Sequence, residues 1–196
     1  MTRARIRASA AELFSAHGYA STSINAIARH AGVAVQTVYF TFGSKMVLLK
    51  EMLDVAVAGD EDPVATLDRA WVAEAIAEPD PAEQLRLQTG TAREILERAA
   101  PVLGALRGAA TADPEAAELW ATNRAQHREV QHHLIEHLAA KAELRDGMSV
   151  RTATDIALTI GGIETYQLLV HDCGWSPQQW EHWAADVLVE RLLNSS

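Results

Sequence analysis

The chain has 196 residues, 48% of them hydrophobic and 22% charged, and its 36 alanines favour helices over strands. The composition argues against a disordered or collagen-like protein. The single cysteine, Cys173, and the lack of an apolar core behind the charged first residues argue against a secreted protein and favour the cytoplasm. No apolar run approaches the roughly 18 residues that a membrane span needs. The formal net charge is −9, but residues 1–50 carry six basic and one acidic side chain, which leaves an acidic remainder and predicts two segments with different partners.

Capping residues and glycines divide the chain into helices. Candidate N-caps, four of them followed by proline, are Ser44, Asp62, Asp80, Asp113, Ser149 and Ser176, with Glu83 and Gln179 extending two of them to capping boxes. Stops are expected at Gly32, Gly59, Gly147 and Gly174. We find no strand alternation, so the fold class is all-α, with about nine helices at residues 3–17, 23–30, 34–40, 44–58, 63–77, 81–109, 114–142, 149–172 and 176–193. Pro101 is expected to break or kink its helix.

The first fifty residues combine one longer helix with two short ones. The longer helix has a stripe that we expect to be buried, at Ile6, Ala10, Leu13, Phe14 and His17. The short helices are joined at Gly32, with Ala28 where they cross and Val33 and Val38 closing the core beneath. Two short helices joined by a tight glycine turn form a helix-turn-helix, whose second helix enters the DNA major groove.

The chemistry of the second short helix suits base and phosphate contacts. Gln36 can bond to adenine, and Val35 or Thr37 can contact a thymine methyl group. Further side chains suit phosphates or base edges, and the arginines at positions 3, 5 and 7 add nonspecific attraction. The candidate DNA-binding residues are Thr22, Ser23, Val35, Gln36, Thr37, Tyr39, Phe40, Thr41 and Lys45. A helix-turn-helix can also mediate protein contacts, and Tyr39 and Phe42 could be core aromatics.

Four consecutive motifs resemble the DNA-binding domain of the TetR/AcrR family of bacterial transcriptional regulators. The similarity covers residues 6–49 and is carried by AAELF at 10–14, GYASTS at 18–23, IARHAGV at 27–33 and TVYFTFGSK at 37–45. It implies a homodimeric, ligand-responsive regulator, usually a repressor. The domain boundaries that follow are a DNA-binding domain at 1–50, the helix 44–58 as connector, and a helical effector-binding and dimerisation domain at 51–196.

Two positions depart from the family pattern. Ala34 stands where many members have a serine-like cap, and Thr41 stands where many have a histidine that contacts phosphate. These two departures leave open another function, that of an adaptor protein that dimerises but has lost operator specificity.

The acidic body lacks catalytic signatures and any motif for a covalent cofactor, which favours a binding protein over an enzyme. Polar residues interrupt the apolar stripes of the helices 114–142 and 149–172, and two tryptophans could form the wall of an apolar pocket. A small-molecule effector site is therefore expected to use Trp71, Trp120, Asn123, His127, Glu164 and Gln167. Core packing or internal hydrogen bonds are the alternative role for each of them.

The segment His133–His137 matches H-x-x-E-H, a zinc-peptidase pattern. His133 and His137 share one helix face and could bind zinc, with Glu136 as a catalytic carboxylate. A metal-dependent hydrolase is therefore the rival function, and a partly solvated helix face is the plainer interpretation.

The last two helices are apolar on more than one face. Gly161 and Gly162 permit close helix approach, and the final helix carries Trp180, Trp183 and several leucines. The resemblance implies a four-helix bundle across a homodimer axis, and such a dimer presents two recognition helices to a palindromic operator. The effector would act by favouring a conformation in which the two helices no longer match the DNA.

Overall fold

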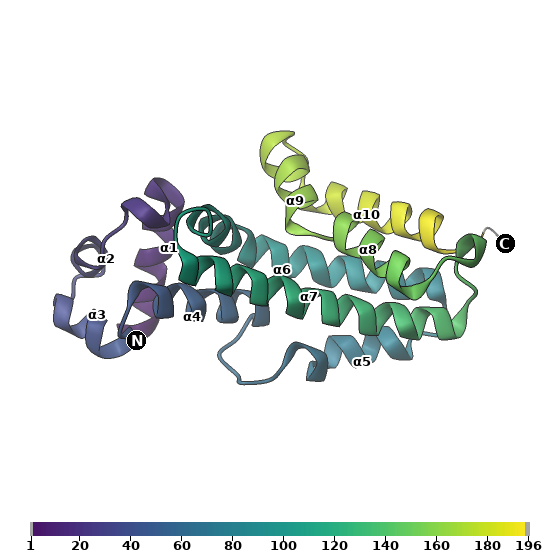
Figure 1. Cartoon of the computed structure of the whole chain (residues 1–196), viewed down its shortest axis with the longest axis horizontal. Helices are drawn as coiled ribbons and strands as arrows, with labels where there is room; N and C mark the ends of the chain where they lie inside the picture. Colours follow the sequence, from purple (N-terminus) through teal and green to yellow (C-terminus); the bar gives the residue numbers. More distant parts are fainter. Residues whose placement is uncertain (1, 195–196) are drawn as a thin grey trace. The chain divides into compact units, whose positions relative to one another are not determined.

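The computed structural model describes residues 2–194 and forms helices along almost the whole of this range (Figure 1). No strand occurs within these residues, and an isolated antiparallel bridge joins Leu144 and Leu193. The all-α prediction is therefore confirmed. In chain order the elements are α1 (Thr2–Ser21), α2 (Ile24–His30), α3 (Val35–Phe42), α4 (Lys45–Ala58), η1 (Thr66–Asp68), α5 (Ala70–Ala77), α6 (Pro81–Ala109), α7 (Pro114–Lys141), η2 (Arg145–Gly147), α8 (Val150–Ile160), α9 (Ile163–Tyr166), η3 (Gln167–Asp172) and α10 (Pro177–Leu192).

Most of the predicted helix starts are present and capped as expected. The Ser44, Ser149 and Ser176 hydroxyls accept hydrogen bonds from backbone N–H groups three residues ahead, and Ser176 forms a complete capping box with Gln179. The Asp80 and Asp113 carboxylates likewise accept bonds from the first turns of α6 and α7. The capping box predicted with Glu83 is wrong, because the Asp80 N–H donates to Glu78 instead.

The helix predicted at 63–77 is shorter in the structure. Residues 62–65 are not helical, a short 3₁₀ turn η1 follows, and α5 begins at Ala70. Val64 is 45% exposed, and the hydrophobic side chains that pack into the core begin with Leu67 and Trp71. Without a buried face, the Asp62-Pro63 signal does not start a helix, because packing supplies most helix stability.

The helix predicted at 149–172 is interrupted at two glycines. α8 ends at Ile160, α9 starts at Ile163, and η3 continues as a π-helix. A Cβ atom on Gly162 would lie 2.5 Å from the carbonyl oxygen of Leu158, a contact that only glycine avoids. The two glycines therefore break the helix. Pro101, by contrast, does not break α6, which runs without interruption from Pro81 to Ala109.

By its contacts the chain divides into two compact units. The N-terminal unit contains residues up to Glu61 together with Arg98–Asn123, and the C-terminal unit contains Asp62–Glu97 and the residues from Arg124 onward. The long helices α6 and α7 each contribute to both. The N-terminal unit thus extends beyond residue 50. The boundary predicted there, between a DNA-binding domain and an effector-binding and dimerisation domain, stays a prediction.

Each unit has its own core. In the N-terminal unit the buried side chains include Ile6 and Phe14 of α1, Ile27 of α2, Val38 of α3 and Leu48 of α4. Of the predicted buried stripe on α1, Ile6, Ala10 and Phe14 are buried, Leu13 is half-buried and His17 is exposed.

In the C-terminal unit, α8 and α10 run side by side (Figure 1), and their core joins Leu85, Ile135, Leu138, Ala153, Ala157, Leu188 and Leu192. A second cluster joins α5 to α7 through Val72, Ala75, Val130 and Leu134.

Candidate nucleic-acid interface

The turn between α2 and α3 has the geometry that the sequence predicts. Ala28 is 1% exposed, which allows the close helix crossing, and its carbonyl accepts a hydrogen bond from the Val33 N–H at 3.0 Å. Gly32 has a φ of +61°, a left-handed conformation that favours glycine. Val38 is fully buried and Val33 is half-buried. These contacts hold α3 as the second helix of a helix-turn-helix.

The inner and outer faces of α3 differ sharply in exposure. Val38 and Phe42 are buried and anchor the helix. On the outer face, Gln36 is exposed, Tyr39 is 53% exposed and Phe40 is 94% exposed. Because Phe40 lies almost entirely in solvent, packing within the monomer does not explain it. The structure thus leaves a polar amide, a phenol and an aromatic ring open to a partner.

The other candidate residues of α3 are less available. Val35, Thr37 and Thr41 are half-buried, and the Thr41 hydroxyl donates to the Thr37 carbonyl at 2.6 Å. Ala34 occupies the N-cap position of α3 without a side-chain hydrogen bond. The exposed Ser23 hydroxyl caps α2 by accepting from the Ala26 N–H, which leaves its own proton free to donate.

Lys45 and Thr22 are occupied inside the N-terminal unit. The Lys45 ammonium donates to the carbonyls of Tyr19 and Thr22 at 2.7 and 2.8 Å and lies 4.0 Å from the centre of the Tyr19 ring. Thr22 is 2% exposed, and its hydroxyl donates to the carbonyl of Gly18. The Thr22 hydroxyl and the Lys45 ammonium are thus both engaged within the N-terminal unit, where Lys45 ties α4 to the α1–α2 turn, and their contacts to phosphate stay predictions.

Burial around this tie shifts two pKa values. Burial lowers the pKa of Lys45, and the nearby negative charge of Asp113 partly offsets the effect. Burial likewise raises the pKa of Tyr19 to about 12, so its phenol stays protonated at physiological pH.

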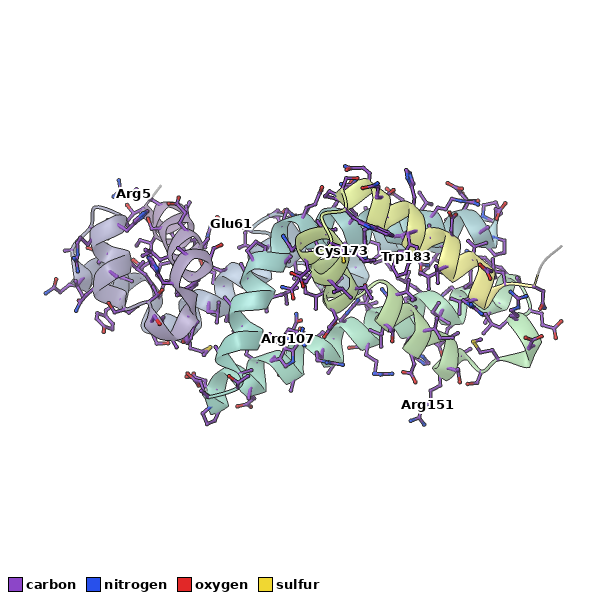
Figure 2. The ribbon with its side chains drawn as sticks, turned by 90° about the horizontal axis from the view of Figure 1, so that it is seen from above. Arg5, Glu61, Arg107, Arg151, Cys173 and Trp183 are labelled. Carbon is purple, nitrogen blue, oxygen red and sulfur yellow. The ribbon has the colours of Figure 1, made fainter. Side chains whose placement is uncertain are left out.

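Two of the three N-terminal arginines are paired with acids. Arg3 and Arg7 both bond to Glu51 of α4, Arg7 also bonds to Glu61, and Arg3 lies over the Phe42 ring at 4.9 Å. Their charge is balanced locally, so the expected nonspecific attraction to DNA from these two is weaker than the sequence indicates. Arg5 is exposed and projects from α1 (Figure 2).

The six residues predicted for an effector site fall in both units. Trp120 and Asn123, both half-buried, belong to the N-terminal unit. The C-terminal unit holds Trp71, which packs on the α5–α7 cluster, and Gln167, which is half-buried in η3. Glu164 is exposed and pairs with Arg124 at 3.7 Å.

His127 is the predicted effector residue whose ionisation the protein alters. Burial lowers its pKa, Glu164 acts in the opposite direction, and Arg124 adds a smaller lowering. The imidazole is therefore neutral at physiological pH. No sequence pattern singles out Gln88 of α6, which is 7% exposed and has an amide nitrogen without a hydrogen-bond partner among the described residues.

The histidines of the H-x-x-E-H segment are engaged within the C-terminal unit. His137 bonds through Nδ1 to the His133 carbonyl at 2.9 Å, and Glu136 lies 3.4 Å from His132. Among residues 2–194, no group of three or more histidine, cysteine or acidic side chains is placed to hold a metal ion. The segment thus lacks the third protein ligand that a catalytic zinc site needs.

Comparison with known proteins agrees with the helix-turn-helix geometry. The sequence profile of bacterial regulatory proteins of the tetR family matches residues 6–52, while no curated protein matches the sequence significantly. Among solved structures, NalD of Pseudomonas aeruginosa, the secondary repressor of the MexAB-OprM multidrug efflux pump, is 25% identical, with a TM-score of 0.73 over 100% of this chain and 97% of its own.

Two further structures share the fold. The TetR family transcriptional regulator PfmR of Thermus thermophilus is 22% identical, with a TM-score of 0.69 over 97% of this chain and 100% of its own. FadR of Bacillus subtilis, solved with stearoyl-CoA, is 18% identical, with a TM-score of 0.71 over 95% of this chain and 97% of its own.

The fold and the exposed recognition helix define a DNA-binding transcriptional regulator. Residues 6–52 match the tetR family of bacterial regulatory proteins, and the fold of the whole chain is similar to that of regulators of this kind. The family and the structural neighbours are regulators, which argues against the rival hydrolase function. None of the described helices is long and apolar enough to span a membrane.

Proposed function

We propose that the protein is a cytoplasmic repressor that binds a palindromic operator as a homodimer and is released by a small-molecule effector. The observation that carries the DNA-binding part is the 94% exposure of Phe40 on a helix whose opposite face is buried at Val38 and Phe42. A bare aromatic ring beside an exposed Gln36 fits a base edge in the major groove, where apolar and amide groups read thymine and adenine.

The remaining contacts in this proposal are to the DNA backbone. The Tyr39 phenol and the free Ser23 proton can donate to phosphate oxygens, and the N-terminus of α4 after Ser44 supplies backbone N–H groups with a favourable dipole. Thr41 and Thr37 lie at the margin of this surface. Lys45 contributes mainly by holding α4 against the turn that precedes α2.

The proposed dimer uses the outer faces of the last two predicted helices, 149–172 and 176–193, the first of which is divided into α8, α9 and η3 and the second of which is α10. Trp183 of α10 is half-buried and packs edge-on against Trp175 with ring centres 6.1 Å apart, and Leu168 of η3 is 55% exposed. Exposed apolar groups close together are typical of association surfaces. A two-fold dimer would place two copies of α3 on successive turns of the operator.

The effector and the sign of regulation are supported by the relatives. NalD is described as a repressor, FadR was solved with stearoyl-CoA, and a further neighbour with 21% identity and a TM-score of 0.62 is a gamma-butyrolactone receptor. A mainly apolar small molecule that carries polar groups is consistent with the half-buried His127 and Gln167 of the C-terminal unit. Such a ligand would lower operator affinity only if it binds the DNA-incompatible state more tightly.

Fluorescence anisotropy on DNA fragments from around the protein's own gene, repeated over a salt series, tests this proposal. We expect submicromolar binding to one fragment that competitor DNA does not displace, and at least about tenfold weaker binding for Phe40→Ala. Val64→Ala, an exposed apolar change outside the interface, is the matched control. Equal, steeply salt-dependent binding to every fragment would contradict specific recognition.

A further inference from the structure

The amide of Gln88 is buried without a partner for its nitrogen. Gln88 is 7% exposed, and its Nε2 atom has no hydrogen-bond acceptor among residues 2–194. Gln84, one turn earlier on α6, is satisfied at both ends: its Nε2 donates to the Leu134 carbonyl at 3.0 Å, and its Oε1 accepts from Lys141 at 2.6 Å. Buried donors are almost always paired, so an unpaired one calls for an absent acceptor.

The contact between Gln84 and Leu134 fixes what surrounds Gln88. α6 and α7 are joined by a short loop at 110–113 and run antiparallel, so one turn forward on α6 corresponds to one turn back on α7. Gln88 therefore lies level with Val130, and His127 follows within the next turn of the same α7 face. α5 covers this stretch, because Val72 and Trp71 pack on the cluster that contains Val130.

Three cationic side chains of α7 already have partners. Lys141 is bonded to the carbonyl of Glu78 at 2.7 Å as well as to Gln84. Arg124 pairs with Glu164, and Arg128 pairs with Asp155. His127 is neutral because burial lowers its pKa. The Lys141 ammonium has no carboxylate among these partners, but its N–H groups already donate to the carbonyls of Ala75 and Glu78 and to Gln84. An anionic occupant would have to displace one of these acceptors, so the desolvation of a charged occupant would be poorly compensated.

We propose that the Gln88 side-chain amide is the hydrogen-bond donor for the effector, and that the effector is an uncharged, mainly apolar molecule bearing a carbonyl group. The carbonyl accepts from Nε2, while the apolar part packs beside Trp71 and Val130. This inference rests on the proposed function, since it names the ligand class of the same regulator. Without effector, the Gln88 amide nitrogen is a buried donor without an acceptor, and the carbonyl of the ligand supplies that acceptor.

The first test needs no ligand. If the Nε2 donor is unpaired in the free protein, Gln88→Leu removes an unsatisfied buried donor and raises Tm, whereas Gln84→Leu takes one hydrogen bond from Lys141 and one from the Leu134 carbonyl and lowers Tm. A fall in Tm for Gln88→Leu comparable with that for Gln84→Leu would overturn the proposal, because it would show that the amide is bonded inside the protein, to a buried water included.

The second test measures ligand class directly by titration calorimetry and tryptophan fluorescence. The probes are 2-alkanones from six to twelve carbons, with n-alkanoates and n-alkylammonium ions of equal length. We expect ketones to bind the wild type, Gln88→Leu to bind them at least about tenfold more weakly, and Gln126→Leu, an exposed glutamine on α7, to match the wild type. No ketone binding, tighter binding of a charged series, or an unchanged Gln88→Leu would each overturn the assignment.

Operator binding separates this proposal from the proposed function. Gln88→Leu should bind the operator as the wild type does in the absence of ligand, and should lose only release by the ketone. A wild type that binds ketones without any specific DNA binding would refute the regulator and leave the Gln88 site standing. Specific DNA binding combined with unchanged ketone binding by Gln88→Leu would support the regulator and refute the Gln88 site.

Discussion

At the scale of single residues, Lys45 shows how a side chain suited to DNA can serve the domain that presents it. Its ammonium bonds to two carbonyls and covers the Tyr19 ring. A sequence with lysine beside a recognition helix indicates a phosphate contact, because basic residues there usually have that role. The tie instead depends on residues 23 and 26 positions away in the chain, and no local pattern reveals it.

We expect Lys45→Met to lower the stability of the protein and to weaken operator binding, because the carbonyls of Tyr19 and Thr22 each lose one hydrogen bond and α4 loses its contact with the α1–α2 turn. The loss of stability should be about 1–3 kcal/mol. Lys50→Met, an exposed lysine on the same helix, should leave stability within about 0.5 kcal/mol of wild type. Urea unfolding measures the difference. Weaker DNA binding at unchanged stability would return Lys45 to the phosphate contacts.

Glu51 makes the stability of the N-terminal unit depend on pH. Hydrogen bonds from Arg3, and then from Arg7, lower the pKa of its carboxyl below the ordinary value despite some desolvation. A carboxyl whose folded pKa is depressed stabilises the fold above its unfolded pKa, and this contribution disappears as the pH falls through the folded value.

Glu51→Gln should therefore lower Tm at pH 7 and lose much of the further fall in Tm between about pH 5 and 3. Thermal unfolding monitored by circular dichroism over this pH range measures both effects. Glu12→Gln, at an exposed acid on α1, is the control. Parallel pH profiles for Glu51→Gln and the wild type would show that the arginine pairs carry no net stability.

At the scale of the elements, most helix starts were predictable, the one at Asp62-Pro63 excepted, and the interruption after α8 was not. A cap such as Ser176 with Gln179 is written within four residues, and the structure repeats it. The break between α8 and α9 is different, because two glycines are compatible with a close helix contact as well as with a break. The outcome depends on packing against α10, which is remote in sequence.

The break at Gly162 predicts a strong effect of a single methyl group. Gly162→Ala places Cβ 2.5 Å from the Leu158 carbonyl oxygen, so the backbone must shift, and we expect a loss of more than about 1 kcal/mol in urea unfolding. Gly108→Ala, a glycine within α6 with open space around its Cβ position, should instead stabilise the protein by about 0.5–1 kcal/mol. A neutral Gly162→Ala would mean that the turn relaxes without cost.

At the scale of the whole molecule, the sequence predicts the N-terminal unit better than the C-terminal one. Ordered motifs specify the helix-turn-helix down to Ala28 and Gly32, because its contacts are short-range. A ligand site in the second unit depends on which helix faces meet. Glu164 interrupts an apolar stripe yet is exposed and paired with Arg124, whereas Gln88 was not singled out and is the buried amide without a partner among the described residues.

The proposed dimer is the whole-molecule property that function needs most, and Trp183 offers a way to remove it. Trp183 is a half-buried side chain on α10 (Figure 2), so a charge there should disrupt an apolar interface without emptying the core. We expect Trp183→Asp to sediment as a monomer and to bind a full palindrome with at least about a hundredfold lower affinity, because the second half-site no longer adds its contacts.

Binding to an isolated half-site should be the same for Trp183→Asp and the wild type, since each copy of α3 remains intact. Gln126→Asp introduces the same charge on an exposed position of α7 and should leave the dimer in place. Sedimentation velocity and anisotropy on full and half operators measure these outcomes together. A dimer that survives Trp183→Asp would assign the two-fold contact to a surface other than the exposed face of α10, whereas a monomer with undiminished affinity for the palindrome would show that operator recognition does not require two recognition helices.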